Sequence, residues 1–376
     1  MLVIVHFSPL ELYPPIQNLI EVIDERNEPY KRIILSTNAI NDDLTLVNSQ
    51  NKNTRLIRLG KSNDKFKPII RYWNYLLFYI GSLIVIIWNR PHCILYYETI
   101  SCWPVYIYKF FFNRKCTVYI HYHEYTSPGE YKNGTFLMRI FNRLEKRLYP
   151  LSSWISHTNK YRLNLFQSDI MPIAPSNPQI IPNYPSRKWF SSTRRPIDYP
   201  VKVVYVGAIS IDSMYTKQFV SWVLAQSGKV LFDLYSLYID PPAIDYFLKL
   251  NSDFIRLKQA VDYKKLPSVL ANYDVGIILY KGHIPNYVFN APNKLFEYLA
   301  LGLDVWFPIE LIGTLEYARS NIKPKILSLD FNKMETFDLP LAISACTKMA
   351  NDEFFCENAF TPLLNQIKRQ YESLNE

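Results

Sequence analysis

A lysine and a glutamate three residues apart are the side chains of this chain best suited to chemistry. They are Lys294 and Glu297, in the segment NAPNKLFEYLALGLDV (290–305). Turn-forming residues and Pro292 open the segment, which predicts a helix start, and the spacing puts both side chains on one helix face. A helix start with a lysine in its first turn binds anions, and a carboxylate one turn later suits sugar hydroxyls. These are the parts of a nucleotide-sugar diphosphate pocket, although a surface helix with a chance Lys–Glu pair has the same spacing.

The sequence PNKLFEYLALG resembles the donor-binding motif of retaining GT-B glycosyltransferases, the bacterial group called family 4 or group 1. Three further stretches are similar to this family in the same order, namely IIPNYP (180–185), VKVVYVGAIS (201–210) and ANYDVGIILY (271–280). The similarity covers most of residues 175–310, whereas residues 1–175 agree only in pattern. The resemblance implies a hexosyl-type glycosyltransferase that moves a sugar from a nucleotide-sugar donor to a glycan or lipid-linked acceptor. It also implies retention of anomeric configuration and a role in surface polysaccharide assembly.

The resemblance assigns roles on the donor side of the pocket. Lys294 would hold the diphosphate, Glu297 would accept hydrogen bonds from ribose hydroxyls, and Gly207 would let the backbone approach the donor because it lacks a Cβ atom. The remaining donor-side residues that the family implies are Ser210, Lys217, Val261, Asp262, Tyr263, Asn290 and Asn293. A cation and a helix start can neutralise the departing diphosphate without a metal ion, so we expect neither metal nor cofactor.

Two departures from the family pattern concern the sugar and the mechanism. Many members carry a second glutamate where this chain has Phe289, and Asn290 is the nearest hydrogen-bonding substitute. The arginine that the family often has in the loop after the strand 201–207 is not evident. These departures give weight to a non-catalytic partner that has the fold without the chemistry. A nucleotide-sugar epimerase of the same architecture is a separate alternative.

The first half of the chain carries a second group of candidate residues, in the stretch YIHYHEY. His121, His123 and Glu124 lie at the end of a predicted strand, where the ligand crevice of an open α/β sheet is found. By the resemblance His123 faces the donor sugar and is catalytic, whereas a core role suits His121 better. A metal site at these three residues is an alternative with a weak signature, because no distant further ligand is evident. On the acceptor side we expect Glu124 and, in the opening loop, Glu11.

Short apolar strands alternate with helical segments along the chain. This pattern predicts an α/β fold of GT-B type, with two Rossmann-like doubly wound parallel-sheet domains facing a cleft. We expect an acceptor-side domain over 1–180, a donor domain over 181–355 and a final helix over 356–376 that can cross back to the first domain. The Pro-, Ser- and Asn-rich stretch 172–200 is the predicted linker. A single basic amphipathic helix is predicted over 134–154.

The charge of the first half predicts an acidic partner. Residues 51–150 contain 16 Lys and Arg but only 5 Asp and Glu. Zinc-finger spacing, an RNA-binding signature and a basic recognition helix are all missing from the sequence, so we expect no nucleic acid. An anionic membrane surface or a lipid-diphosphate acceptor fits the charge better.

An apolar segment at 69–88 bears on the membrane question. Its uninterrupted apolar core, from Tyr75 to Trp88, is shorter than the roughly 20 residues that a membrane span needs. Three alternatives remain, which are a helix buried on one face against the sheet, a helix on a membrane surface and a true span. The basic helix predicted over 134–154 could also lie on anionic lipid.

The cysteines indicate the compartment. The chain has 5 of them, scattered and without a CxxC pair, which suits a reducing cytoplasm and argues against a disulfide framework. The first residues lack a basic leader, and we expect no signal peptide. The predicted location is the cytoplasm, with peripheral contact at the inner face of the membrane following from the charge.

Overall fold

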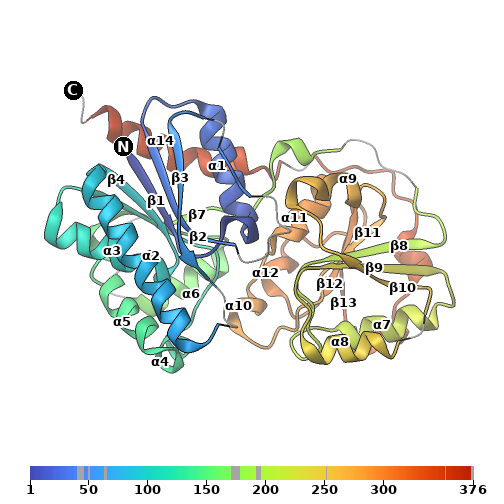
Figure 1. Cartoon of the computed structure of the whole chain (residues 1–376). Coiled ribbons are helices and arrows are strands. Elements are labelled where there is room, and N and C mark those ends of the chain that lie inside the picture. Colours follow the sequence, from blue (N-terminus) through green and yellow to red (C-terminus); the bar gives the residue numbers. More distant parts are fainter. Residues whose placement is uncertain are drawn as a thin grey trace. The chain divides into compact units, whose positions relative to one another are not determined.

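Strands alternate with helices along the whole chain, and they form two parallel sheets in two separate units (Figure 1). The computed structural model describes residues 1–39, 46–49, 51–62, 66–170, 178–191, 196–250, 252–351 and 353–373. The first domain comprises Met1–Asn183 and Cys356–Glu376, and the second domain comprises Tyr184–Phe355. The predicted class of two Rossmann-like parallel-sheet domains is therefore confirmed. The boundary between the two units lies at residue 183, where the prediction has 180.

The first domain is built on a 7-stranded parallel sheet in the order β3-β2-β1-β4-β5-β6-β7. Helices cover a parallel sheet on both faces, and this explains why its strands read as continuous apolar runs. The strands are β1 (Leu2–His6), β2 (Arg32–Asn38), β3 (Thr54–Lys61), β4 (Cys93–Tyr97), β5 (Thr117–Tyr122), β6 (Ser152–His157) and β7 (Gln179–Ile180). The helices are α1 (Pro14–Arg26), α2 (Pro68–Asn89), α3 (Cys102–Ile107), α4 (Pro128–Asn133), α5 (Phe136–Glu145), α6 (Lys160–Ile170) and α14 (Cys356–Glu372).

The second domain repeats this design with a 6-stranded parallel sheet in the order β10-β9-β8-β11-β12-β13. The strands are β8 (Val201–Val206), β9 (Val230–Ser236), β10 (Ile255–Gln259), β11 (Val275–Ile277), β12 (Asp304–Pro308) and β13 (Ile326–Leu329). The helices are α7 (Thr216–Ala225), α8 (Pro241–Leu248), α9 (Leu266–Leu270), α10 (Pro285–Val288), α11 (Asn293–Ala300), α12 (Ile312–Leu315) and α13 (Leu339–Ile343).

One prediction about the first domain is wrong, because residues 134–154 do not form a single helix. The helix α5 ends at Glu145, a short 3-10 turn follows, and the strand β6 begins at Ser152. Glu145 is fully buried, and its carboxylate accepts hydrogen bonds from the hydroxyls of Tyr96 and Thr99. A charged residue expected on a solvated helix face therefore anchors the end of the helix inside the domain.

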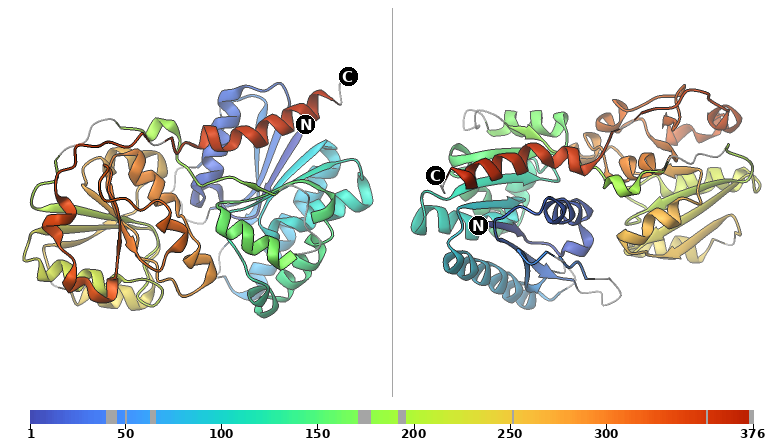
Figure 2. Two further views of the ribbon diagram at one scale, coloured as in Figure 1. Left: turned by 180° about the vertical axis from the view of Figure 1, so that it is seen from behind. Right: turned by 90° about the horizontal axis from the view of Figure 1, so that it is seen from above.

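The last helix of the chain, α14, belongs to the first domain. It packs along α1, where Arg26 donates a hydrogen bond to Asn365 and Lys368 pairs with Glu28 at 3.2 Å. Figure 2 shows α14, in red, lying along this domain beside the N-terminus. Residues far apart in the sequence thus complete one domain.

In each sheet the order of the strands reverses at one point. In the first sheet β1 lies between β2 and β4, and in the second sheet β8 lies between β9 and β11. Ligands of open α/β sheets bind outside the carboxyl ends of the strands at such a switch point. The strand ends that meet there are His6 and Tyr97 in the first domain, and Val206 and Ile277 in the second.

Candidate functional site

The helix α11 carries its charged residues inside the second domain. Pro292, which was predicted to begin the first turn, is the N-cap, and the helix begins one residue later at Asn293. Only 8% of Lys294 and 7% of Glu297 is exposed to solvent. Charged side chains are rarely buried without a partner or a function. The alternative of a chance pair on a solvent-exposed helix is therefore excluded for these two residues.

The ammonium group of Lys294 lies between two tyrosines. Its Nζ donates hydrogen bonds to the hydroxyls of Tyr205, at 3.2 Å, and Tyr280, at 2.9 Å. The same atom lies 4.3 Å and 4.8 Å from the centroids of these two rings, so the ring faces stabilise the partly desolvated cation. An ammonium has three N–H donors, and neither hydroxyl neutralises its charge. This environment attracts an anion.

Gly207 is placed directly against this cation. It follows β8, its φ is +138°, and a Cβ atom there would lie 2.8 Å from Nζ of Lys294. Its own N–H donates to the carbonyl oxygen of Tyr235 at 3.0 Å. A residue without a side chain is required here both for the backbone conformation and for the space beside the ammonium. The structure thus joins two predicted donor residues at the switch point of the second sheet.

Glu297 connects α11 to the predicted base-binding loop. Burial raises the pKa of its carboxyl to about 7, although nearby Lys294 and a hydrogen bond with Tyr263 both lower it. Tyr263 also packs its ring against Trp189, with 4.8 Å between the centroids. In the same loop Asp262 pairs with Lys265 at 3.8 Å, and Val261 packs on the domain core. The structure therefore brings residues 261–263 and Glu297 together.

The remaining predicted donor residues lie on the loops around α11 and β8. Asn293 is the first residue of α11, and the carbonyl oxygen of Asn290 accepts a hydrogen bond from Thr314 at 2.8 Å. Ser210 organises the loop after β8, because its hydroxyl accepts the N–H groups of residues 212 and 213. Lys217 is exposed on α7, and its Nζ lies 5.8 Å from the centroid of the Tyr246 ring. The structure directs Lys217 towards α8, and its role at the donor stays a prediction.

The sequence did not single out the tyrosines that surround Lys294. Besides Tyr205 and Tyr280, Tyr298 reaches the same strand end, where its hydroxyl accepts the N–H of Val206 at 3.2 Å. The ring of Tyr298 occupies the space over Gly276, where a Cβ atom would lie 2.1 Å from it. The available signal was the position of Tyr205 inside a glycine-terminated strand, but 29 tyrosines in the chain obscure any single one.

In the first domain His123 sits at the carboxyl end of β5. Its ring stacks on Tyr97 with 4.9 Å between centroids, and its Nδ1 lies 3.3 Å from the side-chain oxygen of Asn183. Its Nε2 is buried without a hydrogen-bond partner in the described part of the chain. Burial, with His121 and His6 nearby, lowers the pKa of His123 well below its usual value. The ring is therefore neutral, and one of its two nitrogens is left unused inside the described part of the domain.

The neighbours of His123 show which residues hold it. His121 is bonded through Nδ1 to the hydroxyl of Ser156 at 2.8 Å, and burial lowers the pKa of His121 to about 3, as a core residue requires. Glu98 accepts the backbone N–H groups of His123, at 2.6 Å, and of Glu124, at 3.3 Å. Its backbone φ of +61° is unusual for a residue with a side chain. No motif in the sequence pointed to Glu98.

The metal alternative at the two histidines and Glu124 finds no support. In the part of the chain that the structure describes, no three His, Cys, Asp or Glu side chains are grouped as a metal site would require. Instead His121 is bonded to Ser156 and the Nδ1 of His123 to Asn183, while Glu124 is exposed.

The two predicted acceptor-side glutamates differ in their surroundings. Glu11 is buried, and its carboxylate bonds to Arg58 at 2.7 Å and to the N–H of Val47 at 3.0 Å. It holds the segment before β3 against the opening loop, so its carboxylate is already engaged. Glu124 lines a cavity of about 80 Å³ at the carboxyl ends of β5 and β6. Of the two, Glu124 is the one that borders space for a ligand.

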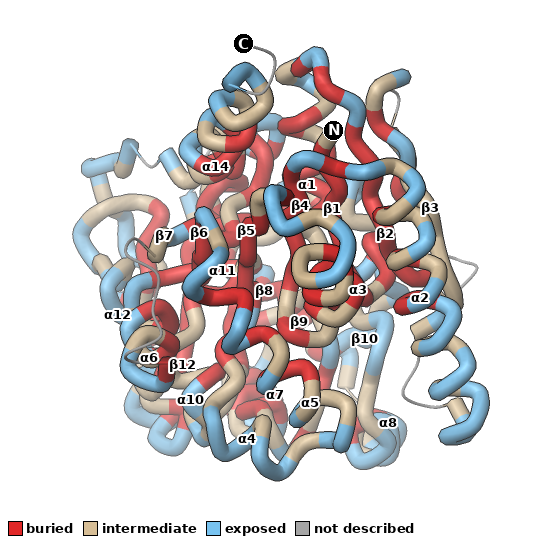
Figure 3. The backbone as a smooth tube through the Cα atoms, turned by 90° about the vertical axis from the view of Figure 1, so that its left-hand side faces the viewer, coloured by how far each residue is buried: buried red, intermediate tan, exposed pale blue. Residues whose placement is uncertain are grey.

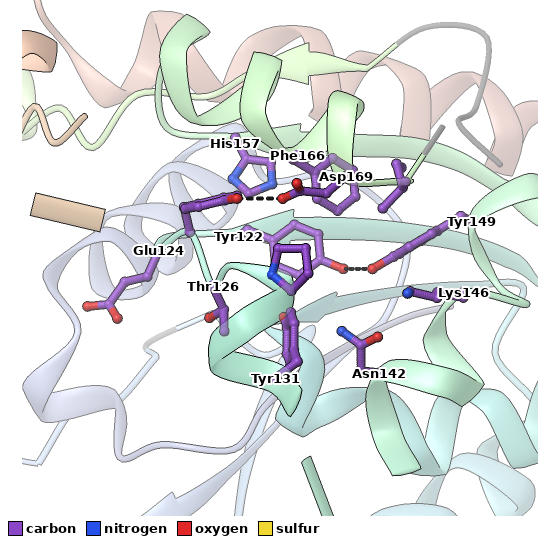
Figure 4. Close-up of a pocket in the computed structure, with 13 residues that line it drawn as sticks. Tyr122, Glu124, Thr126, Tyr131, Asn142, Lys146, Tyr149, His157, Phe166 and Asp169 are labelled. Carbon is purple, nitrogen blue, oxygen red and sulfur yellow. Dashed lines mark hydrogen bonds between the residues drawn. The ribbon is translucent and has the colours of Figure 1, made fainter. Parts of the chain in front are cut away.

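The cavity beside Glu124 has aromatic walls (Figure 4). Tyr122 and Tyr149 are joined by a hydrogen bond between their hydroxyls at 3.2 Å, and Tyr125 is bonded to Asp169. His157 stacks on Tyr122, and both of its ring nitrogens are buried without a partner among the described residues. The cavity thus offers aromatic faces and unused polar atoms close together.

Larger cavities of the second domain lie away from Lys294. One of about 320 Å³ is bordered by Lys202, Asp274 and Lys323, next to the first residues of β8, β11 and β12. Another of about 500 Å³ lies beside β13. Ligands of parallel sheets bind at the carboxyl ends of the strands, so we assign neither cavity to the donor. The contacts around Lys294, rather than the size of a cavity, identify the candidate site.

No protein-family model matches the chain, and no curated protein matches its sequence. Solved structures match it over nearly its whole length. Sucrose-phosphate synthase from Thermosynechococcus elongatus matches with a TM-score of 0.67 at 14% identity, over 100% of this chain and 99% of that chain. The lipopolysaccharide outer core galactosyltransferase WaaB matches with a TM-score of 0.60 at 11% identity, over 97% and 99%.

An enzyme of a different reaction class is similar to nearly the same degree. UDP-GlcNAc 2-epimerase from Neisseria meningitidis, solved bound to UDP-GlcNAc, matches with a TM-score of 0.58 at 13% identity, over 98% of this chain and 100% of that chain. The matches show that the chain has the GT-B fold. Because transferases and epimerases share this fold, the choice between the reactions depends on the site.

Proposed function

We propose that the chain is a retaining glycosyltransferase that moves a sugar from a nucleotide-sugar donor to a glycan or lipid-linked acceptor in surface polysaccharide assembly. The observation that carries the proposal is the buried ammonium of Lys294, which lies against Gly207 at the switch point of the second sheet. A buried cation bonded to neutral hydroxyls favours an incoming anion. In a GT-B fold whose relatives by structure include a protein bound to UDP-GlcNAc, a nucleotide diphosphate is the anion that fits.

Three features would hold the donor. The ammonium of Lys294 would bind the diphosphate, and the first N–H groups of α11, which have no partner within a helix, would bind its oxygens. Glu297 would accept hydrogen bonds from the ribose hydroxyls. Negative charge grows on the diphosphate as its bond to the sugar breaks, and one charged contact of this kind lowers the barrier by about 3 kcal/mol. The protein itself supplies the positive charge, so the proposal includes no metal ion and no cofactor.

The first domain would present the sugar and the acceptor. His123 is neutral, and its Nε2 can bond to a sugar hydroxyl. The acceptor would bind near Glu124, beside the cavity whose walls contain Tyr122 and His157. Aromatic faces with unused polar atoms suit a sugar ring, which is apolar on its faces and polar at its edge. We place the enzyme in the cytoplasm, where nucleotide sugars and lipid-linked acceptors at a membrane would both be within reach.

The substitution Lys294→Met tests the donor site. It keeps an unbranched side chain, one heavy atom shorter, and removes the charge, so affinity for UDP or GDP should fall by about 100-fold. The matched control is Lys202→Met, because Lys202 is exposed at the amino end of β8, the strand whose carboxyl end precedes Gly207. Titration calorimetry with both nucleotides gives the affinities, and thermal melting confirms folding. Unchanged affinity in Lys294→Met would show that the diphosphate binds elsewhere, and absence of nucleotide binding in the unaltered chain would favour a non-catalytic partner.

An epimerase of nucleotide sugars is the second candidate, favoured by the structural likeness to the Neisseria enzyme. Incubation with UDP-GlcNAc and no acceptor separates the two reactions, since an epimerase converts the sugar and a transferase needs an acceptor. Analysis of the recovered sugar for the epimer gives the answer directly.

A further inference from the structure

The helix α2 turns most of its apolar side chains outward. Among the described residues it alone is long and apolar enough to cross a membrane, yet only 22% of its most apolar window is buried inside the domain. Figure 3 shows it in tan and pale blue against the red strands. Its exposed apolar residues are Ile69, Ile70, Tyr72, Trp73, Leu76, Leu77, Ile80, Ile84 and Trp88. A continuous apolar surface of this kind marks an interaction site.

The exposed residues follow the period of a helix. Residues 73, 77, 80, 84 and 88 are spaced by three or four, so they form one stripe along the length of α2. The other face is anchored in the domain, where Phe78 packs on Phe7 with 5.1 Å between the ring centroids and Ile86 is fully buried. A helix of 22 residues is about 33 Å long. The domain therefore holds α2 by one side and offers the whole opposite side.

The topology rules out a membrane span for α2 in this fold. The helix connects β3 to β4, and both strands belong to the same sheet. Both of its ends therefore lie on one side of any bilayer, with the folded domain attached. The helix can lie along a surface but cannot cross it.

Basic residues surround the stripe. Lys67 and Arg71 lie at the start of α2 and Arg90 at its end. The segment Tyr108–Phe112 contacts α2, adds the exposed Phe111 and Phe112, and is followed by two further exposed cations, Arg114 and Lys115. Between residues 66 and 116 the only acidic residue is Glu98, which is engaged with the N–H groups after β5. This is the charge pattern that anionic headgroups attract.

We infer that α2 docks the first domain on an anionic lipid surface, with its apolar stripe at the headgroup–acyl boundary and its basic ends among the headgroups. Tryptophan and tyrosine on the stripe are the residues that favour this boundary. A second copy fits less well, because in a twofold antiparallel pair Lys67 and Arg71 of one copy would face Arg90 of the other. The inference rests on the surface of the first domain and not on the donor chemistry.

Vesicle flotation with the full chain tests the docking. Vesicles of phosphatidylcholine with about one third phosphatidylglycerol should carry the protein upward, those of phosphatidylcholine alone should carry much less, and salt should weaken the binding. The triple variant Trp73→Ser, Leu77→Ser, Ile80→Ser should lose at least about 10-fold in vesicle affinity. The matched control replaces equally exposed apolar residues of the second domain, Ile244→Ser, Leu248→Ser and Leu341→Ser, and should float as the unaltered chain does.

Nucleotide binding by the same variants keeps the two proposals separate, because the stripe variant should bind UDP or GDP as the unaltered chain does. Quenching of tryptophan fluorescence by brominated lipid gives a second measurement with conservative changes. The quenching should be weaker in the double variant Trp73→Phe, Trp88→Phe, which we expect to fold as the unaltered chain does. A protein that stays in the soluble fraction with anionic vesicles at low salt would overturn the inference. So would a stripe variant that floats normally, or a chain that dimerises through the stripe without binding vesicles.

Discussion

The helices α2 and α11 break the ordinary rule of burial in opposite directions. In α11 the charged Lys294 and Glu297 are buried with only 8% and 7% exposed, whereas in α2 the apolar Trp73 and Trp88 are 61% and 85% exposed. A buried charge and an exposed apolar surface both raise the free energy of the isolated domain. In the proposals made above, an anion would compensate the buried charge of Lys294, and a lipid surface would cover the apolar face of α2.

The residues that indicate a ligand or a binding surface are the charged residues that the fold buries and the apolar residues that it exposes. Charged residues inside α11 lie at the carboxyl ends of the strands, where the switch point of the sheet places a ligand. The apolar stripe of α2 is exposed to solvent on the side of the helix opposite Phe78 and Ile86, which are buried in the domain. The two proposals therefore concern different helices, and we expect variants to affect one without the other.

The largest expected effect lies within α2 itself, between two neighbouring residues on opposite faces. Phe78 is fully buried, so Phe78→Ala should lower the free energy of unfolding by about 3–5 kcal/mol. Leu77 is 56% exposed, so Leu77→Ala should change it by no more than about 0.5 kcal/mol. Urea denaturation measures both. A cost for Leu77→Ala close to that of Phe78→Ala would mean that the outward face is packed, and the contrast with α11 would disappear.

The next effect distinguishes two glycines of the second domain that share a positive φ. Gly207→Ala puts a Cβ atom 2.8 Å from Nζ of Lys294, so the ammonium must move, and nucleotide affinity should fall by about 30–100-fold. Gly228 has φ of +88° and faces the ring of Phe254 instead. Both changes should destabilise the fold by about 1 kcal/mol, because alanine resists a positive φ. Only Gly207→Ala should weaken nucleotide binding, and calorimetric titration with UDP or GDP measures this. An equal loss of affinity in Gly228→Ala would contradict the prediction.

Much of this contrast could be predicted from the sequence, and part of it could not. Alternating apolar strands predicted both sheets. The stretch 201–210 predicted Gly207 and the motif at 290–305 predicted Lys294 and Glu297 at one donor site, and the structure brings these residues together. The sequence also shows the apolar run of α2, but it does not show that most of these side chains are exposed to solvent. Whether a helix face meets a neighbour or solvent depends on the packing of the layer, and an all-round apolar helix carries no periodic signal to reveal it.

Other failures have separate physical causes. The end of the predicted helix 134–154 was missed because Glu145 reads as a solvated residue, whereas hydroxyl groups from other segments satisfy its carboxylate. Glu98 and Tyr280 escaped notice because each acts through contacts with residues distant in the sequence. The topology of the fold sets contacts of this kind, and the neighbouring residues in the sequence carry no signal of them.

The smallest expected effect is a pH dependence of the free energy of unfolding that comes from Glu297. Its pKa of about 7 in the fold lies above the value of 4.5 for an unburied carboxyl. The fold therefore favours the protonated form, so the stability from this group is fully present below pH 4.5 and is lost as the pH rises through 7. Glu297→Gln mimics the protonated form. In nucleotide-free protein it should raise the free energy of unfolding at pH 8 by about 2 kcal/mol and have little effect near pH 5.

The same substitution should act in the opposite direction on the ligand. An amide replaces the carboxylate that accepts the ribose hydroxyls, so affinity for UDP or GDP at pH 8 should fall by about 10-fold. Glu335→Gln is the matched control, because Glu335 is exposed in the second domain and its substitution should change neither stability nor its pH dependence. Urea denaturation at the two pH values and calorimetry at pH 8 give both numbers for both variants. A gain in stability together with a loss in binding is what a buried charge kept for a ligand requires. If Glu297→Gln changed the free energy of unfolding by the same amount at both pH values, the carboxylate of Glu297 would lie in a solvated environment. The contrast with α2 would then lose its basis.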